Sequence, residues 1–97
     1  MDRFREMRVF LAVADERSFV AAARRLNVSP PTATRAVAAL EERIGTPLLA
    51  RTTRRVSLTA AGERYLEDCR RILAELAEME ESAAGTRLIP RGERKPG

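Results

Sequence analysis

Histidine is absent from this chain of 97 residues, and cysteine occurs once, at Cys69. Together these absences exclude histidine-based catalysis, zinc fingers and a disulfide framework. A lone thiol is typical of a reducing compartment. No apolar run approaches the roughly 18 residues of a membrane span, and the N-terminus lacks the apolar core of a signal peptide. The sequence thus predicts a soluble cytoplasmic protein that has no metal, no cofactor and no membrane partner.

Enzymatic chemistry is not expected either. The sequence contains no nucleophile–base pair, no cluster of metal ligands and no glycine-rich phosphate loop. The length suits one domain and leaves no room for a second. We therefore expect the function to be binding.

The charges are unevenly distributed along the chain, whose net charge is +4. Residues 1–58 carry 11 arginines against six acids, and residues 59–83 carry three arginines against seven acids. Residues 84–97 carry four cations against one acid. Seventeen of the 18 cations are arginine, whose planar guanidinium suits phosphates and guanine edges. This distribution predicts a compact basic part, then an acidic helix and a basic tail.

Hydrophobic periodicity and capping residues predict a mainly helical fold. Helices are expected over residues 3–15, 19–26, 30–44 and 60–82, with short strands over residues 48–51 and 55–58. Ser18, Ser29 and Thr59 are expected N-caps, and Gly45 is expected to end the third helix. The apolar stripe of the first helix is expected at Phe4, Met7, Phe10, Leu11 and Ala14.

These elements predict a winged helix-turn-helix, made of three helices and a β-hairpin wing, in residues 1–58. A long linker and dimerisation helix is expected in residues 59–83, and a flexible basic tail in residues 84–97.

The third helix has two contrasting faces. Its buried stripe is expected at Ala33, Val37, Leu40 and Ile44. The opposite face holds Pro31, Arg35, Ala38 and Glu42, flanked by Thr32 and Thr34. The N-terminal half is therefore small, hydroxylated and cationic, whereas the acids lie at the far end. This polarity suits a helix that enters the major groove of DNA by its N-terminal half, although an ordinary amphipathic helix with a solvated face remains an alternative.

The predicted hairpin carries Arg51, Arg54 and Arg55 next to Thr52 and Thr53, with no acid nearby. Arginine on a narrow loop can reach the minor groove, and threonine hydroxyls can bind phosphates. A solvated run of charge is the alternative. The order of helix, tight turn, helix and basic hairpin favours DNA.

The fourth helix carries a heptad-like apolar stripe. Tyr65, Cys69, Ile72, Leu76 and Met79 alternate spacings of four and three residues, and Leu66 and Leu73 widen the stripe. Such a long stripe predicts a partner helix, with folding back onto the domain as the alternative. Cys69 lies in the stripe and is interpreted as a small buried hydrophobe.

Specific motifs resemble the N-terminal domain of LysR-type transcriptional regulators, in unbroken order over residues 3–83. They are residues 18–26, residues 28–31, Ala39-Leu40-Glu41, Gly45, Leu48-Leu49, Arg51, residues 56–59 and Gly62. The chain departs from the family at Leu49, where phenylalanine is frequent, and at Pro30, where glutamine is frequent and can supply an amide contact.

The resemblance implies which residues would contact DNA. In the third helix they are Pro30, Pro31, Thr32, Thr34 and Arg35, and in the wing Arg54. Ser29 and Arg51 would assist at the phosphate backbone, for which the hairpin also offers Thr52, Thr53 and Arg55. The linker helix would pair antiparallel with its counterpart in a homodimer, and a full-length form could build a higher oligomer.

Family members usually continue into a C-terminal effector-binding domain, and this chain stops where it would begin. The chain is therefore either a DNA-binding domain excised from a longer protein or a naturally short form. A small-molecule effector is expected only if that missing domain exists.

The leading hypothesis is sequence-specific binding of double-stranded DNA by a dimeric transcriptional regulator. The rival is a protein-interaction module, in which the same surfaces recruit a partner without reading DNA. The clustered arginines of the hairpin, beside the acid-free end of the third helix, argue against the rival.

Overall fold

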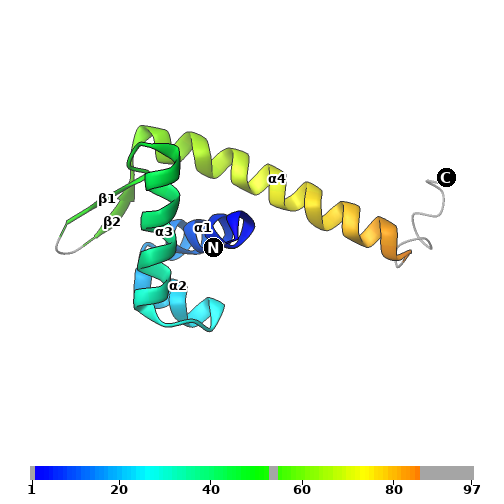
Figure 1. Ribbon diagram of the computed structural model, residues 1–97, viewed down its shortest axis with the longest axis horizontal. Helices are drawn as coiled ribbons and strands as arrows, with labels where there is room; N and C mark the ends of the chain where they lie inside the picture. Colours follow the sequence, from blue (N-terminus) through cyan, green and yellow to red (C-terminus); the bar gives the residue numbers. More distant parts are fainter. Residues whose placement is uncertain (1, 53–54, 86–97) are drawn as a thin grey trace.

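The computed structural model describes residues 2–52 and 55–85. Along the chain these form α1 (Arg3–Glu16), α2 (Phe19–Leu26), α3 (Pro30–Ile44), β1 (Leu49–Arg51), β2 (Val56–Leu58) and α4 (Ala60–Ala84). The first three helices pack into a compact body, the two strands form a hairpin beside it, and α4 extends away as a long arm (Figure 1). This arrangement confirms the predicted winged helix-turn-helix with a long final helix.

Local capping determines where the helices begin and end. The Ser18 hydroxyl accepts the Ala21 N–H at 3.0 Å, and the Ser29 hydroxyl accepts the Thr32 N–H at 3.2 Å. Thr59 caps α4 in the same way, and Gly45 ends α3 with a φ of 90°, in the left-handed region that favours glycine. These predicted caps are confirmed. Asp2 also caps α1, although it was not among the predicted caps.

The core lies where α1, α2 and α3 meet. Ala22 and Ala23 of α2 are fully buried, and such small side chains let the helices approach closely. Larger side chains fill the remaining space, namely Phe10, Val13, Val37, Leu40 and Leu48.

The predicted buried position at Ile44 is wrong, because this side chain is 40% exposed, and Phe4 of the apolar stripe of α1 is also 40% exposed. The helix α1 contacts α2, α3 and α4, so its buried face is broader than one stripe and includes Val9 and Val13. That face also buries the carboxylate of Glu6, which pairs with Arg43 of α3. A charge this deeply buried requires such a partner.

The hairpin is a two-stranded antiparallel sheet. Its register pairs Leu49 with Leu58 and Arg51 with Val56, and each strand begins one residue later than predicted. Leu49 is buried, while Val56 and Leu58 are half-buried and pack against the core. The face toward the body thus carries three apolar side chains, and the exposed residues Ala50 and Ser57 lie on the other face.

The arm begins against the body and then leaves it. The ring of Tyr65 meets that of Phe10 edge-on, with centroids 5.4 Å apart, and Arg70 pairs with Asp15 at 2.6 Å. Leu73 also packs against the core, and the C-terminal part of α4 then continues past the rest of the molecule (Figure 1). In the described part of the chain, none of the helices is both long and apolar enough to cross a membrane.

Candidate nucleic-acid interface

The outer face of α3 is the surface that the helical periodicity predicted. Pro31, Arg35, Ala38 and Glu42 are all exposed, and Thr32 and Thr34 beside them are half-buried. On the inner side Ala33, Ala36, Val37 and Leu40 are completely buried. The side chains expected to face DNA thus share one accessible side of one helix.

The first turn of α3 presents hydroxyls and proline rings to solvent. Pro30 and Pro31 carry no N–H, and the next two amides donate to Ser29, from Thr32 to its hydroxyl and from Ala33 to its carbonyl at 3.1 Å. The Ser29 and Thr32 hydroxyls also lie 2.8 Å apart. A phosphate here would therefore meet side-chain hydroxyls, since the backbone amides of this turn are already engaged.

Arg51 is held by contacts inside the chain. Its guanidinium carbon lies 4.7 Å from the centre of the Phe19 ring, and its Nη2 lies 3.9 Å from Oε1 of Glu41. Phosphate binding by Arg51 stays a prediction, but the structure gives this side chain a second set of partners. Neither Phe19 nor Glu41 could be predicted as a neighbour of Arg51, since no local pattern brings residues 19, 41 and 51 together.

Arg55 is exposed and comes immediately before β2, and it forms hydrogen bonds with Thr52, the residue after β1. The Thr52 hydroxyl accepts the Arg55 N–H at 3.0 Å, and the Thr52 N–H donates to the Arg55 carbonyl at 3.0 Å. Thr53 and Arg54, at which contacts with DNA are predicted, lie outside the described residues. Residues 86–97 of the tail also lie outside them.

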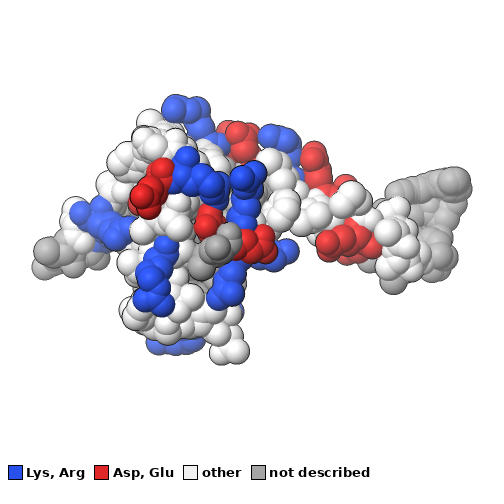
Figure 2. Space-filling view, viewed as in Figure 1, with Lys and Arg blue, Asp and Glu red and all other residues white. Residues whose placement is uncertain are grey.

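The described surface is richer in positive charge over the body than along the arm. Figure 2 shows arginine side chains over the helical body and the hairpin with a few acidic side chains among them, and arginine and acidic side chains intermixed along the arm. A polyanion is therefore expected to meet the body and the hairpin.

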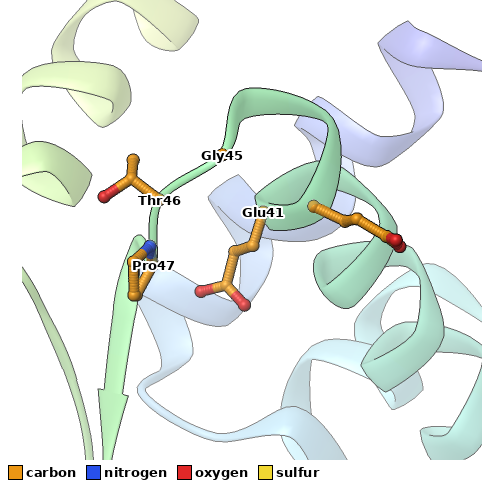
Figure 3. Close-up of a pocket in the computed structure, with 5 residues that line it drawn as sticks. Glu41, Gly45, Thr46 and Pro47 are labelled. Atoms are coloured by element: carbon orange, nitrogen blue, oxygen red, sulfur yellow. The ribbon is translucent and has the colours of Figure 1, made fainter.

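A shallow open depression lies between the end of α3 and the loop after it. Its lining is Glu41, Glu42, Gly45, Thr46 and Pro47, and its volume is about 430 Å³. Figure 3 shows the Glu41 side chain between the helix and the Pro47 segment. Its Oε2 accepts the N–H groups of Leu48 and Leu49, so this carboxylate serves the fold. Within the described residues, no three metal-ligating side chains gather at one place.

The apolar stripe of α4 divides into two parts. Cys69 is 1% exposed in a single chain and packs in the chain's own core, so the prediction that it faces a partner is corrected. Burial raises its thiol pKa, and burial with the neighbouring Cys69 raises the pKa of Tyr65 to about 12. Farther along, Ile72 is 38% and Met79 is 61% exposed. Leu66, Leu73 and Leu76 are half-buried.

A helix-turn-helix followed by a hairpin and a long helix defines a class of regulatory proteins, and comparison with known families identifies one of them. The model for bacterial regulatory helix-turn-helix proteins of the lysR family matches residues 4–63. The chain belongs to this family.

Relatives and solved structures agree with this assignment. The transcriptional regulator ClcR of Pseudomonas putida is 54% identical over 70 residues, which are 72% of this chain and 24% of that protein. This chain thus spans about a quarter of the length of that curated relative. The CbnR DNA-binding domain in complex with DNA is 42% identical with a TM-score of 0.82, over 90% of this chain and 99% of that one. The BenM domain with benA site 1 DNA is 31% identical, with a TM-score of 0.83 over 90% and 97%.

Proposed function

We propose that this chain binds double-stranded DNA sequence-specifically, as the DNA-binding domain of a LysR-type transcriptional regulator. The observation that carries the proposal is the exposed outer face of α3, cationic and hydroxylated at its N-terminal half and free of acids there. The similarity to two domains solved with DNA supports it. A regulator of this kind works where the bacterial chromosome is, so we propose a cytoplasmic location.

The N-terminal half of the outer face of α3 would enter the major groove, while Glu42 lies at the far end of that face, away from the groove. The residues proposed to face it are Pro30, Pro31, Thr32, Thr34 and Arg35, with Arg54 of the wing at the neighbouring minor groove. Those proposed at the phosphate backbone are Ser29, Arg51, Thr52, Thr53 and Arg55. Arg35 is the best candidate for reading a base, because an exposed guanidinium can form two hydrogen bonds with guanine.

The experiment that tests base reading compares two substitutions of arginine by alanine. A duplex is first selected from a random library with the unaltered chain, and binding is then measured on its single-base variants. Arg35→Ala should cost about 1–3 kcal/mol on the selected duplex and relax preference at one position per half-site. The control, Arg64→Ala, removes an exposed arginine of α4 and should leave base preference unchanged. Equal losses on every sequence for Arg35→Ala would show that Arg35 contacts phosphate only.

Salt dependence separates DNA binding from the rival interaction module. If a dimer neutralises roughly six to eight phosphates, log K against log salt should have a slope of about −5 to −7. A slope shallower than about −2 would contradict a dimer docked in the grooves.

We also propose that residues 59–83 form the dimerisation helix, which joins two copies of the DNA-binding winged helix-turn-helix in residues 1–58. Leu73 packs partly against the core of the same chain, whereas Ile72 and Met79 are exposed and Leu76 is half-buried, so the apolar stripe is only partly covered within one chain. A second copy of α4 would cover them. Two linked modules make the second DNA contact intramolecular, which raises affinity by about 10² to 10⁴.

The dimer is tested by placing one charge in the stripe. Leu76→Asp should give a monomer with a folded winged helix and little operator preference, because the new carboxylate would be buried without a partner. Ala74→Asp adds the same charge on an exposed position on the opposite side of α4 and should leave the dimer intact. Analytical ultracentrifugation and a palindromic-site titration measure both. A Leu76→Asp variant that stays dimeric would contradict this interface.

A further inference from the structure

The wing, defined as β1 and β2, is too small to fix its own direction. Each strand has three residues, and a two-stranded hairpin is at best marginally stable alone. Its inner side chains pack on the core, and the Thr59 hydroxyl donates to the Pro47 carbonyl at 2.9 Å at its base. These contacts leave open what ties the wing to α3, the helix whose placement it must match on DNA.

Glu41 makes that connection from the last turns of α3. Its Oε2 accepts the N–H of Leu48 at 2.8 Å and that of Leu49 at 3.0 Å, at the point where β1 begins. Both leucines are buried, and the Glu41 side chain is only 18% exposed. Hydrogen bonds from amides to a carboxylate are about twice as strong as those between neutral groups, and partial burial limits competition from water.

The other oxygen of the same carboxylate faces the far end of β1. Oε1 of Glu41 lies 3.9 Å from Nη2 of Arg51, the last residue of that strand, and the guanidinium lies over the ring of Phe19. Phe19 is the first residue of α2. Arg51 also pairs with Val56 in the ladder, so its position carries over to β2. The two oxygens of one side chain thus contact both ends of β1.

We infer that Glu41 is a positioning residue for DNA recognition, which sets the direction of the wing relative to α3 through Leu48, Leu49 and Arg51. The inference rests on the proposed DNA binding. By its charge alone, an acid close to DNA should lower the affinity for every sequence. Glu41 instead contributes to the difference in affinity between a specific site and other DNA. Contacts of this kind depend on geometry held within about 0.5 Å.

The test uses a matched pair of isosteric changes on neighbouring residues. Glu42 is exposed, and its side chain forms no hydrogen bond or ion pair with another described residue. Glu42→Gln therefore removes only a charge. In Glu41→Gln the amide oxygen can still accept from Leu48 and Leu49, while the NH₂ group replaces the oxygen that faces Arg51. This variant keeps the start of β1 in place and releases its end.

Both variants of the 97-residue chain are titrated with the duplex selected by the unaltered chain and with a scrambled duplex. Glu42→Gln should raise affinity for both duplexes by the same factor. Glu41→Gln should raise affinity for the scrambled duplex likewise, but reduce the ratio of selected over scrambled affinity by about fivefold to tenfold, as the loss of one coupled contact does. If Glu41→Gln instead changes both duplexes by the factor seen with Glu42→Gln, the inference is overturned.

A second variant covers the case in which Glu41→Gln folds poorly. Arg51→Lys keeps the positive charge, and hence any attraction to phosphate, but loses the planar group that stacks on Phe19. It should reduce the same affinity ratio, and the double variant should be no worse than either single change. Undiminished preference in Arg51→Lys, or fully additive losses, would overturn the inference.

A structural readout is independent of DNA. The Phe19 ring should shift the Arg51 side-chain proton resonances upfield, and Glu41→Gln should abolish the shift while Glu42→Gln preserves it. Persistence of the shift in Glu41→Gln would count against the inference. If the unaltered chain selects no duplex over scrambled DNA, the proposed function fails as well, whereas normal selection with a silent Glu41→Gln removes only the positioning role.

Discussion

Gly62 stands in the first turn of α4, a place where alanine would ordinarily stabilise a helix by about 1 kcal/mol. Here the neighbouring backbone reverses that expectation. A Cβ at this position would lie 2.0 Å from the carbonyl oxygen and 3.0 Å from the carbonyl carbon of Leu48, and 3.2 Å from a methyl group of Leu58. The same oxygen accepts the Thr59 N–H at 3.0 Å. Gly62→Ala must therefore push the start of the arm away from the base of the wing.

The magnitude follows from three terms. Overpacking against a rigid neighbour costs about 1–3 kcal/mol, and we take the upper value because the atom is backbone and Leu48 is buried. Weakening the bond from Thr59 adds about 1 kcal/mol, and the helix propensity of alanine returns about 1 kcal/mol. The free energy of unfolding should fall by about 3 kcal/mol. In a domain of this size that lowers the melting temperature by roughly 12–24 °C.

Urea unfolding and thermal melts check this at one protein concentration, because a dimer's stability depends on concentration. The control is Ala74→Gly at an exposed position of α4, which should cost about 1 kcal/mol through helix propensity alone. Unaltered protein should then be the most stable, Ala74→Gly intermediate and Gly62→Ala the least. A Gly62→Ala variant as stable as the unaltered chain would refute the close approach of α4 to the backbone of Leu48.

Three further outcomes are expected. Asp15→Asn removes the ion pairs with Arg25 and Arg70, so it should lower the free energy of unfolding by less than about 1 kcal/mol at low salt. A loss of stability that persists at about 1 M salt would show that the ion pairs are not its cause. The raised pKa values of Tyr65, about 12 against 10.0, and of Cys69 mean that the folded chain holds both protons more tightly. The stability that these two protonated groups contribute is therefore complete below about pH 9 and is lost as the pH rises toward about 12. The melting temperature should fall across this range, and it should fall less in Tyr65→Phe. Alkylation of Cys69 should proceed only as fast as the core opens, and immediate modification of the native protein would contradict its burial.

Features that depend on a few neighbouring residues were predicted well from the sequence. The caps at Ser18, Ser29 and Thr59 and the stop at Gly45 are where the pattern placed them. A cap satisfies backbone groups within three residues of itself, so no distant element is needed to form it. The outer face of α3 could be predicted for a similar reason, because helical geometry alone separates its two sides.

Burial, by contrast, depends on which elements pack together. The period of α1 showed that it is amphipathic, but its contacts with three other helices decided that Phe4 stays partly exposed and that Glu6 is buried. The heptad-like stripe of α4 likewise did not reveal that the body of the same chain covers Cys69, while Ile72 remains accessible. Periodicity identifies an apolar side but not what covers it.

The clearest division concerns the charged residues. The sequence by itself determined the family, the order of the elements and the abundance of arginine in residues 1–58, because these are properties of local pattern and composition. Only the tertiary structure brought Arg51 together with Phe19 and Glu41, across separations of 32 and ten residues. A guanidinium can bind a phosphate, pair with a carboxylate or stack on an aromatic ring. Which of them it meets is decided by how α2, α3 and β1 pack, and that packing is a property of the whole fold.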